Sequence, residues 1–419
     1  TNTPPVGAFR GYGHQEGHLP VERLMDILAR KLKMDPFLLR EKNYLGPGKK
    51  NAQGERYYPQ SGSVRDCEAK VRAAIFSGDK PKEDDTFFYG RGFAALMKSP
   101  KGAPFSSKSC YLKMNPDGSV VINMGGAEVG QGLRMAVQQI AGEALQIDPA
   151  KIRVYQEIDT QYCPWEWQTI GSMFTTQGGR AIVRACNKAI AMLKETAAKA
   201  LLCDVDHLDY DGQRVYLKHD PELGIPIQRL IHGYITETGI TIGDVVHTTS
   251  DARLPRYSGP DANGQGNLGV EYTFGAQACQ IRIEKKTGKI LIDHFASSFD
   301  VGTVINPKQI RGQIAGGVMI GIGATLHEQI KYDDKGNILN PSFGKYRFPN
   351  IKDTPAKQTI ECVENPGEVG PFGARGIGEH PVVGVAPALL NAIHDAIGIE
   401  FYEIPVTPEK ILAALAAKI

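Results

Sequence analysis

The segment GARGIGEHP, residues 373–381, places three glycines at 373, 376 and 378 directly before a carboxylate, Glu379. Glycine has no Cβ atom, so a backbone with this spacing can turn sharply and approach a bulky group. The residues that follow, 382–397, repeat leucine and isoleucine at helical spacing, so the loop leads into a helix N-terminus, where anions are favoured. We expect a base beside an anionic cofactor. A solvated glutamate after a glycine turn, or one that caps the helix, is the alternative.

Similar glycine groups recur along the chain. They are Gly11-Tyr12-Gly13, Gly125 to Gly132, Gly171-Ser172 with Gly178-Gly179, and Gly312-Gln313 with Gly316-Gly317. Glycine loops that open helices suit one large phosphate-bearing ligand held by backbone N–H groups. We therefore expect segments 125–132 and 312–317 to present such groups to a ligand. The usual nucleotide motifs do not occur, because GPGKK at 46–50 lacks the spacing of a P-loop and no strand is followed by G-x-G-x-x-G.

Length and composition limit the class of protein. The chain has 419 residues, of which 42% are hydrophobic, so it can bury a substantial core and is too long for one simple domain. The net charge is +2 with both signs mixed, which gives no basic stripe for nucleic acid. No apolar run approaches the roughly 18 residues of a membrane span, and no signal peptide is visible. The seven cysteines form no C-x-x-C pair, which argues against a zinc or iron–sulfur site here and predicts a cytoplasmic protein.

Local patterns predict both helices and strands. Apolar spacing predicts helices over 20–33, 67–75, 133–147, 180–202 and 382–397, with Pro20 at the start of the first. The turn NPDG at 115–118 predicts a hairpin of strands 109–114 and 119–123, and KTG at 286–288 predicts a second hairpin of strands 280–284 and 289–292. Residues 251–266 are rich in Pro, Gly, Asp and Asn, which indicates a long loop.

Four motifs in a fixed order resemble one enzyme family. They are AFRGYG at 8–13, EVGQG at 128–132, DVG followed by NP and GQ between 300 and 313, and GIGE at 376–379. Together they resemble the C-terminal part of the molybdopterin-binding catalytic subunit of the xanthine dehydrogenase / aldehyde oxidase family, the molybdenum hydroxylases. The resemblance covers essentially the whole chain. His380 and Arg375 depart from the family, which usually has proline and lysine there.

The resemblance implies a fold, a cofactor and partners. The expected fold is α+β, with two lobes that hold an extended pterin dinucleotide. The expected divisions are a helical segment over 1–86, a first molybdopterin-binding lobe over 87–250, and a second lobe with the glutamate loop over 251–419. The implied cofactor is molybdopterin, in the cytosine dinucleotide form, with its molybdenum held through the pterin dithiolene. The implied partner chains carry the N-terminal half of the molybdopterin subunit, 2Fe-2S iron–sulfur clusters and FAD.

The motif positions also imply site residues. Glu379 corresponds to the family's catalytic base, which deprotonates the hydroxyl that attacks a carbon atom. The cofactor-binding positions implied are Phe9, Arg10, Gly11, Gly130, Gln131, Gly171, Ser172, Gln313, Gly376 and Gly378. Tyr12 and Phe105 are expected to sandwich a planar substrate. Ordinary surface roles for the arginine and the glutamines, and a buried core position for Phe105, are the alternatives.

The implied reaction inserts oxygen from water into a C–H bond of an aromatic N-heterocycle such as a purine or nicotinate. Oxidation of an aldehyde or of carbon monoxide is the alternative within the family. A non-catalytic module that binds or assembles a cofactor is the alternative of another class. A buried carboxylate behind the glycine loop distinguishes the enzyme from the binding module, which has no need of one.

Overall fold

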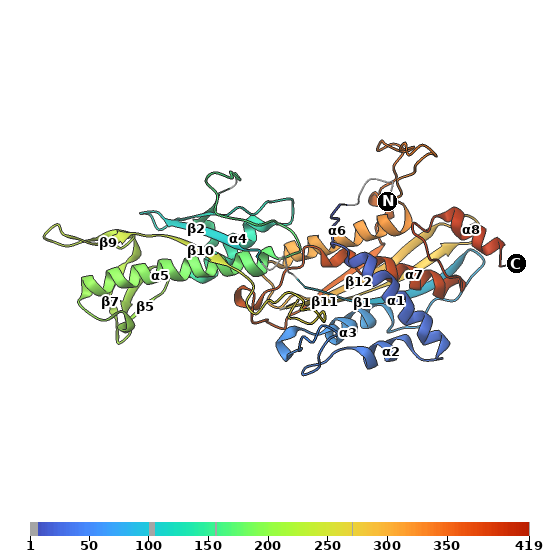
Figure 1. Ribbon diagram of the computed structural model, residues 1–419, viewed down its shortest axis with the longest axis horizontal. Coiled ribbons are helices and arrows are strands. Elements are labelled where there is room, and N and C mark those ends of the chain that lie inside the picture. The colour runs from blue at the N-terminus through green and yellow to red at the C-terminus, as the bar shows by residue number, and fades with distance from the viewer. Residues whose placement is uncertain (1–6, 100–104, 156, 270, 419) are drawn as a thin grey trace. The chain divides into compact units, whose positions relative to one another are not determined.

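The computed structural model describes residues 7–99, 105–155, 157–269 and 271–418, which form two compact units of helices and strands (Figure 1). Unit 1 takes its residues from 1–100, 271–367 and 377–419, and unit 2 takes its residues from 101–270 and 368–376. The mixed α+β fold predicted from the sequence is confirmed. The two units interleave in sequence, and the division into cofactor-binding lobes at 86 and 250 stays a prediction. No helix in the described ranges is both long and apolar enough to cross a bilayer.

Unit 1 is built on a four-stranded sheet with the order β1-β11-β12-β13. Its strands are β1 (Phe87–Lys98), β11 (Thr273–Glu284), β12 (Ile290–Asp300) and β13 (Lys357–Val363). The first three pair antiparallel and β13 joins β12 in parallel. The helices of this unit are α1 (His14–Lys31), α2 (Pro36–Asn43), α3 (Val64–Ile75), α6 (Pro307–Leu326), α7 (Val385–Ile397) and α8 (Pro408–Ala416). Its 3₁₀ turns are Pro59–Ser61, Ile351–Asp353 and His380–Val382.

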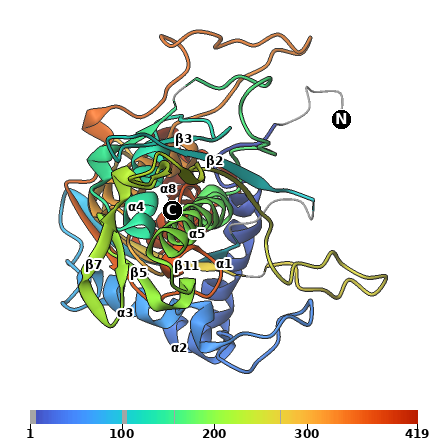
Figure 2. The ribbon, with the colours of Figure 1, turned by 90° about the vertical axis from the view of Figure 1, so that its left-hand side faces the viewer.

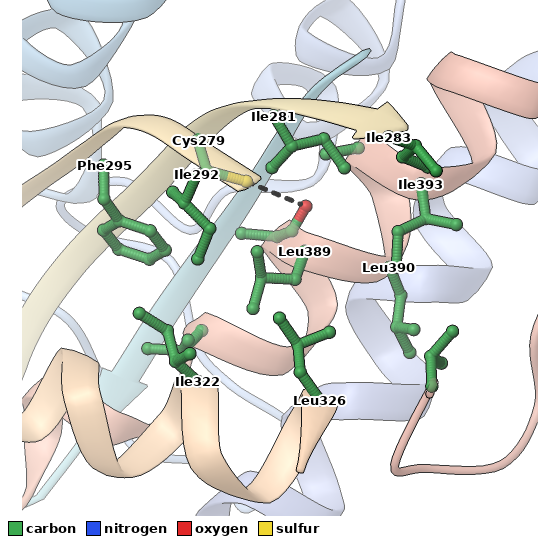
Figure 3. Close-up of a cluster of buried hydrophobic side chains, with 14 of the residues drawn as sticks. Cys279, Ile281, Ile283, Ile292, Phe295, Ile322, Leu326, Leu389, Leu390 and Ile393 are labelled. Atoms are coloured by element: carbon green, nitrogen blue, oxygen red, sulfur yellow. Dashed lines mark hydrogen bonds between the residues drawn. The ribbon is translucent and has the colours of Figure 1, made fainter. Parts of the chain in front are cut away.

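The sheet of unit 1 is buried on both faces. Successive side chains of a strand point to opposite sides of the sheet, so each strand contributes residues to two separate clusters. On one face, buried residues of the strands pack against α6 and α7. Figure 3 shows this cluster, with Cys279, Ile281, Ile283, Ile292 and Phe295 from the strands, Ile322 and Leu326 from α6, and Leu389, Leu390 and Ile393 from α7. On the other face, Phe93, Ala276 and Ala278 pack in a second cluster with residues of α3. Each fully buried aliphatic side chain contributes about 1.5–3 kcal/mol to folding.

Helix α7 lies very close to strand β1, and two glycines make this possible. A Cβ atom on Gly90 would lie 2.0 Å from the carbonyl oxygen of Ala392, and one on Gly92 would lie 2.0 Å from that of Ala388. The thiol of Cys279 on the neighbouring strand donates to the same Ala388 oxygen at 3.5 Å. The close packing fixes α7, the helix that follows the glycine loop, against β1.

Unit 2 contains a four-stranded sheet with the order β10-β2-β3-β4 and a long helix, α5. The strands are β2 (Lys108–Met114), β3 (Val120–Asn123), β4 (Ile152–Val154) and β10 (His247–Ala252), and the helices are α4 (Leu133–Leu145) and α5 (Gly179–Leu201). Figure 2 views α5 nearly along its axis, with α4 beside it. Two smaller sheets follow, β5 (Leu208–Tyr210), β6 (Arg214–Leu217) and β7 (Asp220–Pro226), and then β8 (His232–Ile235) with β9 (Thr241–Val245). The short helical turns are Pro149–Lys151, Phe174–Gly178, Val205–His207, Ile227–Arg229 and Pro371–Gly373.

Two expectations about local structure are wrong. Pro20 lies inside α1, which begins six residues earlier at His14. Segment 312–317 is not a loop before a helix but an inner part of α6, so most of its backbone N–H groups serve the helix itself. Its glycines instead permit close packing: a Cβ atom on Gly317 would lie 2.5 Å from Cβ of Pro381.

Candidate active site

Glu379 stands at the N-cap position of the 3₁₀ turn His380–Val382 that precedes α7. Its side chain makes no capping hydrogen bond and is only 14% exposed. The carboxylate oxygen Oε2 lies 2.8 Å from Nζ of Lys98, whose side chain is 3% exposed. The two alternatives for this residue, a solvated glutamate and a helix cap, are therefore wrong. The sequence analysis missed Lys98, because no local pattern links the end of β1 to the glycine loop.

The residue after the carboxylate, His380, is also buried and ties the loop to β1. Its Nε2 atom lies 3.0 Å from the carbonyl oxygen of Lys98 and donates to it. Burial lowers the pKa of His380 well below its ordinary value, and the charge of Lys98 acts in the same direction. The imidazole is therefore neutral near neutral pH. Lys98 contacts the 379–380 segment twice, through its side chain at Glu379 and through its main chain at His380.

Arg10 brings three predicted cofactor-binding positions together within unit 1. Its Nε donates to the carbonyl oxygen of Gly378 at 2.7 Å, and its Nη2 lies 3.1 Å from both the carbonyl oxygen and the side-chain oxygen of Gln313. Because Gln313 accepts through Oε1, its amide nitrogen is the end that can donate to a ligand. Burial lowers the pKa of Arg10, while the negative charge of Glu379 raises it.

The segment before α1 exposes two aromatic rings. Phe9 and Tyr12 are 54% and 57% exposed. Tyr12 has a φ of 54°, a left-handed conformation that costs about 1–3 kcal/mol in a residue other than glycine and that often occurs at functional sites. Gly11 beside it has a φ of 107°. A pocket of about 310 Å³ adjoins Tyr12 and is lined also by Gly13, His14, Gly17, His18 and Val21.

In unit 2, the 128–132 loop is closed by its own side chains. Glu128 Oε1 accepts from the N–H groups of Gly130 and Gly132 at 3.0 and 2.9 Å. Gln131 donates through Nε2 to the carbonyl oxygen of Ala127 at 2.7 Å and accepts from Val129 N–H at 2.7 Å. The sequence analysis missed the role of Glu128 as the internal acceptor of this loop. Gly130 and Gln131 stay predicted cofactor-binding residues, now with a defined loop geometry.

Ser172 and Gly376 are also brought together in unit 2. A Cβ atom on Gly376 would lie 1.8 Å from the carbonyl oxygen of Ser172, so only glycine fits at 376. Gly171 and Ser172 both adopt left-handed backbone conformations, with φ of 67° and 59°. The π-helical turn Phe174–Gly178 follows and leads into α5. Such turns are frequent at functional sites.

Phe105 is 66% exposed and lies in unit 2, so the alternative of a buried core position is wrong. Its ring meets Trp167 edge-on, with centroids 6.0 Å apart and an interplanar angle of 82°. Tyr12, the other predicted stacking residue, belongs to unit 1. A sandwich of substrate between these two rings stays a prediction.

The available donors fit an anionic, oxygen-rich ligand such as a pterin phosphate. They are the guanidinium of Arg10, the amide of Gln313 and the main chain of glycine-rich turns. Within the described residues, no group of three or more His, Cys, Asp or Glu side chains could hold a metal ion.

Comparison with known sequences assigns the chain to a family. A family profile described as a molybdopterin cofactor-binding domain matches residues 72–355, and a second profile with the same description matches residues 1–44. The chain belongs to the molybdopterin cofactor-binding family. The resemblance inferred from the motifs, to the C-terminal portion of xanthine dehydrogenase and aldehyde oxidoreductase large subunits, is confirmed.

Relatives of this molybdopterin-binding chain have several named activities. A probable hypoxanthine oxidase of Escherichia coli (strain K12) is 31% identical over 99% of the chain and 42% of the relative's length. An aldehyde oxidoreductase of Megalodesulfovibrio gigas is 30% identical over 100% of the chain and 42% of its own length. The chain thus spans less than half the length of these two curated relatives.

Solved structures confirm the fold of the molybdopterin-binding chain. The aldehyde oxidoreductase structure from Desulfovibrio gigas aligns with a TM-score of 0.78 and 28% identity, covering 98% of this chain and 42% of that chain. The reconstituted CO dehydrogenase from Oligotropha carboxidovorans aligns with a TM-score of 0.83 and 24% identity, covering 98% of this chain and 52% of that chain. At that identity, the second similarity bears on the fold alone.

Proposed function

We propose that this chain is the molybdopterin-binding part of a molybdenum hydroxylase in which Glu379 is the general base. The reaction inserts oxygen from water into a C–H bond of an aromatic N-heterocycle such as a purine or nicotinate. The observation that carries the proposal is the partly buried Glu379 carboxylate, held by Lys98 at the end of the glycine loop. A pure binding module has no need of such a group, which argues against the non-catalytic alternative.

In this proposal, one set of residues binds the cofactor and Glu379 transfers the proton. Arg10 bonds to the Gly378 carbonyl and to the Gln313 side-chain oxygen, and we expect the Gln313 amide nitrogen and the turn at Phe9-Arg10-Gly11 to bind the cofactor. Cofactor contacts are also proposed for Gly130, Gln131, Gly171, Ser172 and Gly376. When bound, the molybdenum cofactor supplies the redox centre that takes up two electrons from the substrate. Glu379 removes a proton from the attacking oxygen, a task that suits a positioned, partly buried carboxylate.

The choice of substrate rests on the exposed aromatic rings. Tyr12 and Phe105 present flat apolar faces, which favour a planar heterocycle by stacking. Relatives named as a nicotine 6-hydroxylase large subunit and a probable hypoxanthine oxidase fit this class. Relatives named as an aldehyde oxidoreductase and a carbon monoxide dehydrogenase large chain support the second candidate, an aldehyde or carbon monoxide substrate.

The proposal includes partners and a location. The proposed partners include the N-terminal half of the molybdopterin subunit, and the chain itself spans 42–54% of the length of its curated relatives. Partner chains with 2Fe-2S clusters and FAD would carry the electrons away, and the cofactor would be the cytosine dinucleotide form. One relative is named as a dehydrogenase complex subunit, which supports a hetero-oligomer. All seven cysteines are free thiols, which supports a cytoplasmic location.

The test uses the chain isolated with the proteins that copurify with it. We expect stoichiometric molybdenum and pterin, with cytosine released on hydrolysis. Purine, nicotinate, aldehyde and carbon monoxide are then assayed with an artificial electron acceptor in ¹⁸O-labelled water. We expect a heterocycle to be oxidised with the label in the product. Molybdenum without turnover of any substrate would favour the binding module, and absence of molybdenum from the active complex would overturn the proposal.

A further inference from the structure

The proposed base is paired with a buried cation. Lys98, the last residue of β1, has a side chain only 3% exposed, and its Nζ lies 2.8 Å from Glu379 Oε2. Its ammonium also donates to the carbonyl oxygen of Ser99 at 3.4 Å. Two opposite charges removed from water in this way are strongly coupled, because the loss of one partner leaves the other buried and unpaired.

The main chain reinforces the contact between these two side chains. The imidazole of His380, the residue after the base, bonds to the carbonyl oxygen of Lys98 at 3.0 Å. The glycines at 90 and 92 allow β1 and α7 to approach closely, which fixes the strand that ends at Lys98 against the helix that follows Glu379. The ion pair is therefore built into the packing of unit 1 and is not a chance meeting of two long surface side chains.

We propose that Lys98 is a positioning residue for the base: its ammonium group holds and orients the Glu379 carboxylate at the end of the glycine loop. The inference rests on the proposed function of Glu379 as the general base. It adds a second residue, supplied by a strand far from the glycine loop in sequence, on which the proton acceptor depends.

The other charged and titratable groups near the base act differently. Arg10, from the N-terminal segment, interacts electrostatically with Glu379, but the hydrogen bonds of its guanidinium go to Gly378 and Gln313. His380 stays neutral because burial lowers its pKa well below the ordinary value. On α1, burial also lowers the pKa of His18, whose Nδ1 bonds to the carbonyl oxygen of His14 at 2.8 Å. Lys98 differs from these groups because its ammonium lies in direct contact with the carboxylate.

The first test measures kcat and KM of the intact complex at full molybdenum occupancy. Because Lys98 contacts the proposed base, its loss should fall on the proton-transfer step and lower kcat, while KM stays near the parent value. Lys98→Met should lower kcat by about tenfold or more, as part of the roughly 10²–10⁴-fold that a positioned base supplies. Lys98→Arg keeps the charge and should restore most of kcat. Lys70→Met, which breaks the exposed Lys70–Glu361 pair, is the control and should leave kcat unchanged.

The second test does not depend on turnover. The denaturation midpoint of the full chain is measured for Lys98→Met, Glu379→Gln and the double variant. If the two side chains are coupled, the double variant loses less stability than the sum of the single losses. This measurement also applies to a Lys98→Met chain that assembles poorly into the complex.

The outcomes separate the two proposals. An unchanged kcat in Lys98→Met, or additive losses of stability, would overturn the role of Lys98 while Glu379→Gln remained inactive. Full turnover in Glu379→Gln would overturn the base itself, and the positioning role with it.

Discussion

The Arg10 side chain donates its Nε–H group to the carbonyl oxygen of Gly378, 2.7 Å away. Gly378 directly precedes the proposed base, so the first motif of the chain is bonded to the last one. The same guanidinium bonds to Gln313 on α6. Arg10 therefore joins three segments that are far apart in sequence, and its planar fork is suited to such a junction.

Replacing Arg10 with lysine should weaken this junction. A lysine keeps the charge but cannot reproduce the fixed geometry of two donor groups, so we expect Arg10→Lys to lower the unfolding free energy by about 2 kcal/mol. Molybdenum content per chain should fall as well, because the Gln313 amide loses its orientation. Denaturant unfolding and metal analysis measure the two effects. The control is Arg311→Lys, because Arg311 is exposed and lies on α6, the helix that carries Gln313. Equal losses in Arg10→Lys and Arg311→Lys would contradict the role of Arg10.

Gly376→Ala should disturb the Ser172 turn in unit 2. The added Cβ atom would lie 1.8 Å from the Ser172 carbonyl oxygen, so the backbone must move. We expect a loss of about 1–3 kcal/mol of stability and a lower cofactor content, measured by thermal unfolding and pterin analysis. Gly259→Ala, in the same unit and with no atom within 4 Å of the new Cβ, should unfold like the parent chain. A Gly376→Ala chain with full stability and full cofactor would rule out this contact as a constraint.

The buried imidazole of His380 predicts a loss of stability in acid. Burial holds its pKa well below the ordinary value of 6.5, so below that pH the unfolded chain binds a proton that the folded chain does not. Stability should therefore fall as the pH drops below 6.5, with at most about 1.4 kcal/mol per pH unit from one such group. His380→Gln can still donate to Lys98 but does not titrate, so its slope should be shallower. Exposed His219→Gln is the control, and identical slopes in all three proteins would contradict this account.

Sequence reasoning predicted the elements whose evidence is local. The helix expected over 180–202 is observed at Gly179–Leu201, and the NPDG hairpin is observed as Lys108–Met114 with Val120–Asn123. In both cases, apolar periodicity and turn residues within a short window decide the structure.

The errors concern residues whose role depends on distant partners. The glycines at 312–317 suggested a ligand loop, yet they lie in α6, where Gly317 and Gly321 make room for Pro381 and Val385. The pairing of Lys98 with Glu379 could not be predicted from the sequence either, because it arises only when β1 packs beside α7. Nothing in the sequence around Lys98 marks that lysine as a buried partner.

The central claim, that Glu379 is the base of a molybdenum-dependent hydroxylation, is tested most directly by turnover of Glu379→Gln in the intact complex. The amide keeps the shape of the side chain and removes the proton acceptor. Because the loss falls on proton transfer, kcat should drop by at least about 10²–10⁴-fold, while molybdenum content and KM stay near those of the parent complex. Glu403→Gln, an exposed carboxylate in the same unit, should leave kcat unchanged. Normal turnover of Glu379→Gln at full molybdenum occupancy would contradict the claim.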